Sequence, residues 1–342
     1  MVSNQESPTR SNFRRLISSL IARMFIRPIL FLVFLLIFFQ CSRGQQADQQ
    51  NTVLRIGGAE IDITLPDEQM KVSKDDLLSW VKAAANAVSE YYGHFPVENL
   101  TLRIRASNGS GVRHGVTYPR GGGLILISVG RDTPVDDLKT DWTLTHEMTH
   151  LAFANMADDH HWIEEGIATY VEPIARVQMG QLSVNEMWRE FLRDMPKGQP
   201  QPGDEGLDNT HTWGRTYWGG ALFCLMADVE IRERTHNKKG LQDALRGILN
   251  HGGTITQDWE ITQAFSVGDQ ATGTHVLEEL YRQMSDKPVD VDLDKLWAKL
   301  GLALNGGQVQ FNDNAVEATI RKAMTAAKPV GRELTRTRAK KD

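Results

Sequence analysis

Residues 146–150 of this 342-residue chain read His-Glu-Met-Thr-His, and no other segment constrains the fold as strongly. Leucine and methionine recur around it at helical spacing, and residues 142–153 contain no proline or glycine, so the sequence predicts a helix there. Residues four apart share a helical face, so His146 and His150 can present two imidazoles to one metal ion. Glu147 is rotated from that pair by about 100°, which suits a general base beside the metal.

A second segment offers a third metal ligand. Residues 160–170 read His-His-Trp-Ile-Glu-Glu-Gly-Ile-Ala-Thr-Tyr, and 14 residues separate His150 from Glu165. That length allows one helix to end, the chain to turn at residues 157–159, and an antiparallel helix to return a carboxylate to the metal. Two His and one Glu leave the fourth position of a tetrahedral zinc ion to water, as in catalytic sites. The alternative is that Glu164 and Glu165 only place negative charge at a helix N-terminus.

At these two segments the chain resembles the gluzincin zinc metallopeptidases. In that family the Glu directly before Gly is the third zinc ligand, which implies Glu165 rather than Glu164 here. Residues 217–222, Tyr-Trp-Gly-Gly-Ala-Leu, are similar to the Tyr-x-Lys-Gly-Ala-Leu element of aminopeptidase N-like and glycyl aminopeptidase-like gluzincins. The resemblance implies that the hydroxyl of Tyr217 stabilises the tetrahedral intermediate.

The resemblance also implies a fold. It covers roughly residues 140–302 and is greatest for the glycyl aminopeptidase branch, through Asp228, Ile231, Arg232, Thr235, Leu241 and Leu245. The implied fold is α+β, with a thermolysin-like zincin catalytic core (a small N-terminal mixed sheet plus the zinc helix) and a mainly helical C-terminal subdomain. We expect a reduced, catalytic-core version, without the N-terminal β domain and PDZ module of larger relatives. No Gly-x-Met-Glu-Asn element precedes His146, and aminopeptidase N-like enzymes use one to bind a free amino terminus.

The first 44 residues are expected to target the chain rather than to fold with it. Five arginines precede an unbroken apolar run at residues 29–39, which suits a signal-peptide core better than a full membrane span. Ordinary cleavage, a retained membrane anchor and lipidation at Cys41 stay open as alternatives. In each case the remainder is expected to be exported, to the periplasm, the cell surface or the medium. The membrane is an expected partner where the segment is not cleaved.

Composition and pattern divide the rest of the chain. With 41% hydrophobic residues there is material for one large core or two modest ones, and a net charge of −5 gives no reason to expect nucleic acid binding. The expected segments are a targeting region at 1–44, a linker at 45–52, a gluzincin-like domain at 53–328 and a basic disordered tail at 329–342. Within the domain, 53–155 is the α/β part with the zinc helix, and 156–328 is the helical part.

Local patterns predict individual elements. They are a strand or hairpin at 53–65, a helix from its N-cap Ser73 to about Tyr92, strands at 100–105 and 123–129, a turn at 108–111, the zinc helix within 135–155, and helices at 241–250, 276–284 and 293–300. We expect residues 124–129 to be an edge strand that pairs with extended peptide, and an inner strand is the alternative. Cys224, in an apolar stretch, is expected to be a small core residue.

Together these features predict an exported zinc metallopeptidase with a peptide or protein substrate and one Zn²⁺ per chain. The expected ligands are His146, His150 and Glu165, with Glu147 as general base and Tyr217 as oxyanion donor. Thr169, one helical turn after Glu165, is expected to orient a histidine ligand. His211 is a candidate oxyanion or substrate contact, with a solvated or capping role as the alternative. The rival functions are a zinc-binding pseudoenzyme, which would need neither Glu147 nor Tyr217, and a cell-envelope interaction protein that needs no catalysis.

Overall fold

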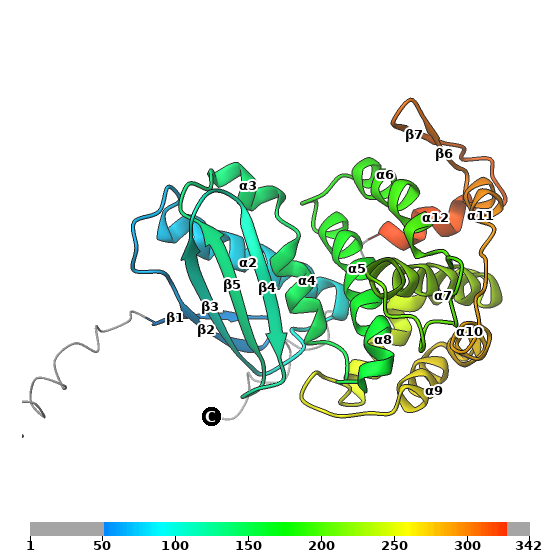
Figure 1. Cartoon of the computed structure of the whole chain (residues 1–342), viewed down its shortest axis with the longest axis horizontal. Helices are drawn as coiled ribbons and strands as arrows, with labels where there is room; N and C mark the ends of the chain where they lie inside the picture. Colours follow the sequence, from blue (N-terminus) through cyan, green and yellow to red (C-terminus); the bar gives the residue numbers. More distant parts are fainter. Residues whose placement is uncertain (1–50, 327–342) are drawn as a thin grey trace, which may run out of the picture. The chain divides into compact units, whose positions relative to one another are not determined.

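The computed structural model describes residues 51–326. The expected targeting segment, Cys41, nearly all of the linker and the basic tail lie outside the described residues. Within residues 51–326 a five-stranded sheet is followed mainly by helices (Figure 1), so the chain has the mixed α/β composition that the sequence predicts. In this part of the chain no helix combines the length and the apolar character needed to cross a membrane.

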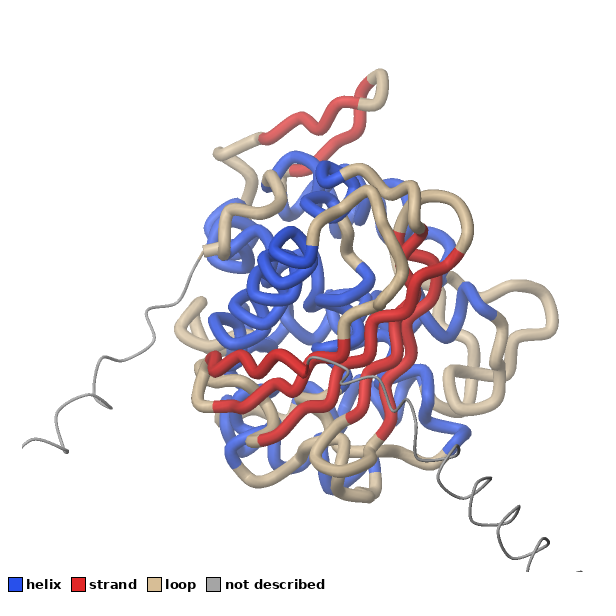
Figure 2. The backbone as a smooth tube through the Cα atoms, turned by 90° about the vertical axis from the view of Figure 1, so that its left-hand side faces the viewer, coloured by secondary structure: helices blue, strands red, loops and turns tan. Residues whose placement is uncertain are grey.

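The sheet has the strand order β1-β2-β3-β5-β4. Its strands are β1 (Asn51–Ile56), β2 (Ala59–Thr64), β3 (Asn99–Ser107), β4 (Val112–Tyr118) and β5 (Leu124–Gly130). β1 and β2 form the expected antiparallel hairpin, β2, β3 and β5 are mutually parallel, and β4 runs antiparallel to β5. Alternate residues of the inner strands are fully buried, as half-buried strands require. Figure 2 shows these strands side by side, with a second, two-stranded hairpin standing apart.

The prediction that residues 124–129 form an edge strand is wrong, and the alternative of an inner strand is confirmed. β5 pairs with β3 on one side and with β4 on the other, so residues 124–129 form an inner strand, and β4 is the edge. The physical reason is visible in composition: Leu-Ile-Leu-Ile is the continuous apolar run of a strand enclosed by neighbours. Residues 112–118 are half-buried or exposed throughout and carry arginine, histidine and glycine, so their strand was missed.

Helix α2 (Lys74–Tyr92) begins and ends where the sequence predicts. The Ser73 hydroxyl accepts a hydrogen bond from the Asp76 N–H at 3.1 Å, and the Asp76 carboxylate accepts one from the Ser73 N–H at 2.9 Å. This reciprocal capping box satisfies two N–H groups that the first helical turn leaves without partners. Gly93, at φ 94°, ends the helix in the left-handed conformation that glycine adopts freely. The buried face of α2 packs against the helices that carry the site.

The predicted helix within residues 135–155 is divided in two. α3 (Val135–Thr140) and α4 (Thr143–His150) are separate helices, and Asp141 lies between them. The Asp141 carboxylate accepts hydrogen bonds from the N–H groups of Thr143 and Leu144, both at 3.2 Å, and from the indole of Trp80 at 3.1 Å. These bonds fix the start of α4 against α2. Both histidines of the metal motif therefore lie on one short, anchored helix.

The remainder of the described chain is mainly helical. It consists of α5 (His161–Gln178), α6 (Val184–Asp194), the π-helical turn η3 (Gly214–Gly219), α7 (Gly220–Arg234), α8 (Leu241–Asn250), α9 (Ile261–Thr272), α10 (Val276–Met284), α11 (Leu293–Leu300), the hairpin β6 (Leu302–Asn305) and β7 (Gln308–Phe311), and α12 (Ala318–Thr325), with short 3-10 turns at Asp158–His160 and Met195–Gly198. The predicted α8, α10 and α11 are confirmed, and Cys224 on α7 is buried as expected. α6, α9 and α12 and the hairpin were not predicted.

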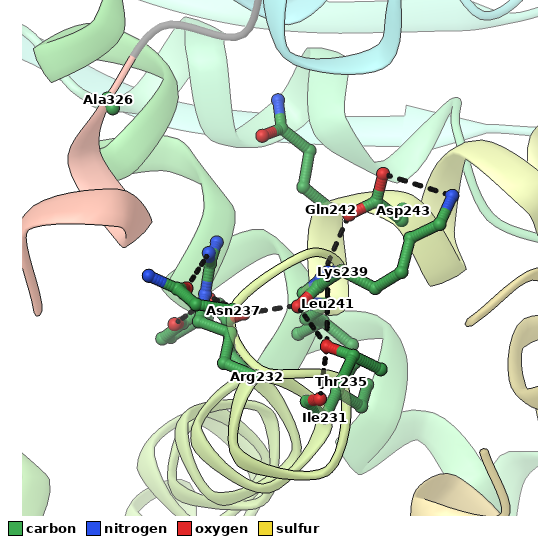
Figure 3. Close-up of polar contacts among 12 residues, drawn as sticks. Ile231, Arg232, Thr235, Asn237, Lys239, Leu241, Gln242, Asp243 and Ala326 are labelled. Carbon is green, nitrogen blue, oxygen red and sulfur yellow. Dashed lines mark hydrogen bonds and ion pairs between the residues drawn. The ribbon is translucent and has the colours of Figure 1, made fainter. Parts of the chain in front are cut away.

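Asp228 joins three helices inside this region. Its carboxylate accepts hydrogen bonds from the Tyr170 hydroxyl at 2.9 Å, from Arg232 at 2.8 Å and from the N–H of Leu241 at 2.8 Å. Just beyond, the Thr235 hydroxyl donates to the backbone oxygen of Ile231 at 2.7 Å and accepts from the N–H of Lys239 at 3.1 Å, which closes the turn after α7 (Figure 3). Four of the residues through which the sequence resembles glycyl aminopeptidases therefore have a structural role, at the α5–α7–α8 junction.

Two glycines let α5 and α7 touch through their backbones. A Cβ atom on Gly220 would lie 2.1 Å from the carbonyl oxygen of Trp162 and 2.7 Å from the Cα of Gly166. A Cβ on Gly166 would lie 2.4 Å from the Cα of Gly220. Such distances are shorter than van der Waals contact, so only glycine permits this approach at either position. The approach sets the spacing between Glu165, next to Gly166, and Tyr217, one helical turn before Gly220.

Gly220→Ala should lower the free energy of unfolding by about 1–3 kcal/mol, because the added methyl group forces two packed backbones apart. Gly219→Ala is the matched control: its Cβ would meet nothing closer than a Leu207 side-chain carbon at 3.1 Å. We expect the control to stay within about 1 kcal/mol of the unchanged chain, since alanine also favours helix. Urea unfolding of the full chain measures both, and equal losses would show that the close crossing is not what Gly220 secures.

Candidate metal centre and active site

α4 and α5 bring together the three residues for which the sequence predicts metal binding. One ligand atom each from His146, His150 and Glu165 lies within 4.8 Å of the other two. The Oε2 atom of Glu165 is 3.1 Å from Nε2 of His146 and 3.6 Å from Nε2 of His150. The cluster lies in a cavity of about 400 Å³ whose walls include His114, Thr117, Met156, His161, Tyr217 and Ile255. Two consecutive turns of α4 supply the two histidines, and α5 supplies the glutamate, so the three donors form one site.

The electrostatics of the cluster fit a divalent metal. Burial lowers the pKa of His150 to about 4, so its imidazole is neutral and has a free lone pair at neutral pH. Burial alone would raise the pKa of Glu165, but hydrogen bonds from His146 and His161 hold it well below the usual range, so the carboxylate is ionised. An ionised carboxylate beside neutral imidazole nitrogen is the donor set that zinc takes in open, catalytic sites. The residues present therefore fit the group that the sequence motif implies.

The edge strand β4 holds Glu147. The Thr117 hydroxyl donates its one proton to Glu147, whose Oε2 lies 2.6 Å from the hydroxyl oxygen and whose backbone oxygen lies 3.0 Å from it. A Cβ atom on Gly115 would lie 2.6 Å from Cγ and 2.7 Å from Oε1 of Glu147, so the side chain occupies space that only glycine leaves open. Burial raises the pKa of Glu147, and the Thr117 hydrogen bond opposes that effect. A buried carboxylate with a raised pKa, beside three candidate metal ligands, is suited to accept and release a proton.

Tyr217 reaches the same cluster from η3. Its ring stacks on the ring of His146, with centroids 6.3 Å apart and planes 17° apart, and on Trp213 at 5.8 Å. Burial and the neighbouring Glu165 carboxylate raise the pKa of Tyr217 to about 12, so its hydroxyl keeps its proton at neutral pH and can donate it in a hydrogen bond. The fold thus brings Tyr217 close to Glu165, although 51 residues lie between them in the sequence.

Thr169 and His211 are placed differently. Thr169 is half-buried on α5, one turn after Glu165, and within residues 51–326 no hydrogen bond joins its side chain to His146 or His150. His211 is exposed in the loop before η3. Neither residue lines the cavity around His146, His150 and Glu165. The structure therefore does not place Thr169 or His211 beside the three candidate ligands, and their roles stay predictions.

The sequence analysis predicts no site role for three residues that contact Glu147 or Glu165 in the structure: Gly115, Thr117 and His161. His161 lies 3.3 Å from Oε1 of Glu165 and 3.0 Å from Oε2 of Glu164, and these contacts raise its pKa to about 10. Its signal was available, because residues three and four apart on a helix face each other. Gly115 also had a signal, since a glycine inside a strand often marks a place where another group approaches closely. The sequence had no comparable signal for Thr117.

This chain is similar to known proteins in structure, not in sequence. No protein-family model matches the sequence, and no curated protein matches it. An aminopeptidase N family protein from Idiomarina loihiensis superimposes with a TM-score of 0.58 at 13% identity, over 75% of this chain and 50% of that chain. An M1 zinc metallopeptidase from Deinococcus radiodurans gives a TM-score of 0.45 at 14% identity, over 70% of this chain and 51% of that chain.

This chain spans about half the length of these structures. The similarity to the Idiomarina loihiensis protein shows a shared fold, in agreement with the zincin-like α+β fold implied by the sequence resemblance. The thermolysin-like arrangement of its details stays a prediction.

Gly115→Ala should displace Glu147 while sparing the fold, because the new methyl group meets the far end of a flexible side chain rather than backbone. If Glu147 acts as a general base in peptide hydrolysis, as proposed below, the rate should fall about 10²-fold, within the range that a positioned base contributes. Metal content, measured by elemental analysis, should not change. Arg103→Ala, at an exposed position of β3 in the same sheet, is the control and should keep the rate. A Gly115→Ala chain as active as the control would separate β4 from the positioning of Glu147.

Proposed function

We propose that this chain is a zinc-dependent metallopeptidase that hydrolyses peptide bonds. The observation that carries the proposal is the convergence of His146, His150 and Glu165 within 4.8 Å, with a buried carboxylate and a protonated phenol beside them. A pure metal-binding site would need neither Glu147 nor Tyr217. The shared fold with an aminopeptidase N family protein supports the same reaction class. His146, His150 and Glu165 would hold one Zn²⁺ per chain.

Each neighbouring residue has a defined task in this reaction. Zinc, when bound, supplies a Lewis acid that activates water and polarises the scissile carbonyl. Glu147 accepts the proton of the attacking water at its carboxylate and returns it to the leaving amine. Burial of Glu147 disfavours its charged form, which favours uptake of the proton from water. Tyr217 keeps its own proton and donates a hydrogen bond where negative charge develops on the carbonyl oxygen.

The free edge of β4 supports binding of an extended peptide. β4 pairs with β5 on one side, and among the described residues no strand pairs with its other side. An extended peptide can add to such an edge through main-chain hydrogen bonds. Residues 112–118 contain no aspartate or glutamate, so this strand has no carboxylate to neutralise a free amino terminus. The proposed substrate is therefore an extended peptide or protein segment bound along β4, next to Glu147.

Export is part of the proposal on the sequence alone. The arginines and the apolar run at residues 29–39 are the features that support it, with the membrane as partner where that segment is retained.

Glu147→Gln separates catalysis from metal binding, because it keeps the size of the side chain and removes its ability to take a proton. With the purified full chain and a peptide library, the unchanged protein should hold one zinc and cleave peptides, and chelation should abolish cleavage. Glu147→Gln should keep the zinc and lose about 10²–10⁴-fold in rate. Zinc bound by the unchanged chain without cleavage of any peptide would indicate a zinc-binding pseudoenzyme instead.

Tyr217→Phe removes one hydroxyl and should leave fold and zinc in place. If the hydroxyl acts only on the developing oxyanion, kcat should fall about 10²-fold or more with little change in KM, as for other single oxyanion donors. Steady-state kinetics on a peptide that the library identifies measures both constants. Trp213→Phe is the control, since it keeps an aromatic ring against Tyr217 without touching the hydroxyl. A Tyr217→Phe chain within twofold of the unchanged protein would remove Tyr217 from the mechanism.

A further inference from the structure

His161 contacts both glutamates of the second segment from the first residue of α5. Its Nε2 atom lies 3.3 Å from Oε1 of Glu165, and its Nδ1 atom lies 3.0 Å from Oε2 of Glu164. The imidazole side chain is 54% exposed, whereas Glu165 is only 11% exposed. The His161 ring, at the cavity wall, therefore contacts a buried carboxylate that also lies next to His146 and His150.

Glu164 is itself held in place. Its Oε1 atom accepts a hydrogen bond from the N–H of Met156 at 3.2 Å, in the segment that connects α4 to α5. Its Oε2 atom faces His161. The contacts thus form a chain that runs from the backbone of Met156 through Glu164 and His161 to Glu165. Both nitrogens of the His161 ring have a partner, which fixes the plane of the ring as well as its direction.

The two oxygens of Glu165 consequently face different partners. Oε2 is the atom near His146 and His150, at 3.1 and 3.6 Å, and Oε1 is the atom that His161 contacts. We propose that His161 is a positioning residue for the third metal ligand: it holds Oε1 of Glu165 and so presents Oε2 to the zinc ion. This inference rests on the ligand set of the proposed function, and it assigns the neighbouring Glu164 the task of anchoring His161.

An exposed helical ion pair is the simpler interpretation, and its consequences differ. Pairs of that kind contribute little to stability and leave metal affinity unchanged. Here the acceptor is a buried ligand with three rotatable bonds, and its second oxygen would otherwise be free to turn toward the metal. Groups that hold a ligand in this way commonly change metal affinity by about 10–100-fold. Zinc affinity therefore distinguishes positioning from a surface pair.

Two conservative variants separate the two contacts of the ring. In His161→Gln the side-chain amide reaches the place of Nε2 and can still donate to Glu165. In His161→Asn the shorter amide reaches only the place of Nδ1 and can donate to Glu164 but not to Glu165. His161→Ala loses both contacts. Asp158→Asn is the control, because it changes a charge in the same cavity and forms no hydrogen bond or ion pair with Glu165 among the described residues.

The readouts are the zinc dissociation constant of the full chain, from competition with a chromophoric chelator, and the visible spectrum of the Co²⁺-substituted protein. We expect zinc to bind about 10–100-fold more weakly to His161→Ala and His161→Asn, with an altered Co²⁺ spectrum because the freed Oε1 can join the coordination. His161→Gln and Asp158→Asn should stay within about threefold of the unchanged chain and keep its spectrum.

Other outcomes overturn the inference in distinguishable ways. If the unchanged chain binds zinc and His161→Ala equals it in affinity and spectrum, His161 does not position Glu165, and the proposed function stands. If His161→Ala changes only the KM for peptide, His161 contacts substrate instead. If His161→Gln is as weak as His161→Ala, the donor to Glu165 is not what matters. If the unchanged chain binds no zinc, the ligand set fails, and this inference fails with it.

Discussion

The rest of the structure depends on one buried contact, that of the Glu165 carboxylate with the imidazoles of His146 and His150. Such groups lose their hydration on burial, so their site is stable only where partners replace the water. His146 and His150 come from a helix whose start is fixed by Asp141, and Glu165 comes from a helix that touches α7 backbone to backbone at Gly166. α2 contacts both helices. Rigid packing around α4 and α5 therefore keeps three donors in place while the cavity above them stays open.

Local rules were enough to predict part of this site from the sequence. The helical period places His146, Glu147 and His150 correctly, because their relation involves only one turn of one helix. The capping box of α2 and the amphipathic helices α8, α10 and α11 are local in the same sense. Glu165 and Tyr217 needed the resemblance to known metallopeptidases, since helix geometry does not say which distant residues will meet. The structure brings both to the cluster, while Thr169 and His211, predicted from proximity in the sequence, lie outside the cavity.

The strand next to the site was the main failure, and its cause is physical. An edge strand with one face toward a cavity buries few side chains, so residues 112–118 lack the alternation by which strands are recognised. The glycine and the threonine of this strand contact Glu147, a long-range relation that no local sequence pattern contains. The apolar run at residues 124–129 gave a clear strand signal, but that same apolar character belongs to an inner strand.

In the proposed reaction, the position of β4 would join substrate binding to proton transfer. Gly115 and Thr117 are two apart, so they belong to one face of the strand, and both contact Glu147. The hydrogen-bonding edge of the same strand is available to an extended peptide. A peptide paired with that edge would therefore be placed in fixed register with Glu147, because one rigid element holds both. Under the proposed function, the base Glu147 and the scissile bond would then need no separate alignment, and a small sheet beside two helices could orient a flexible substrate in this way.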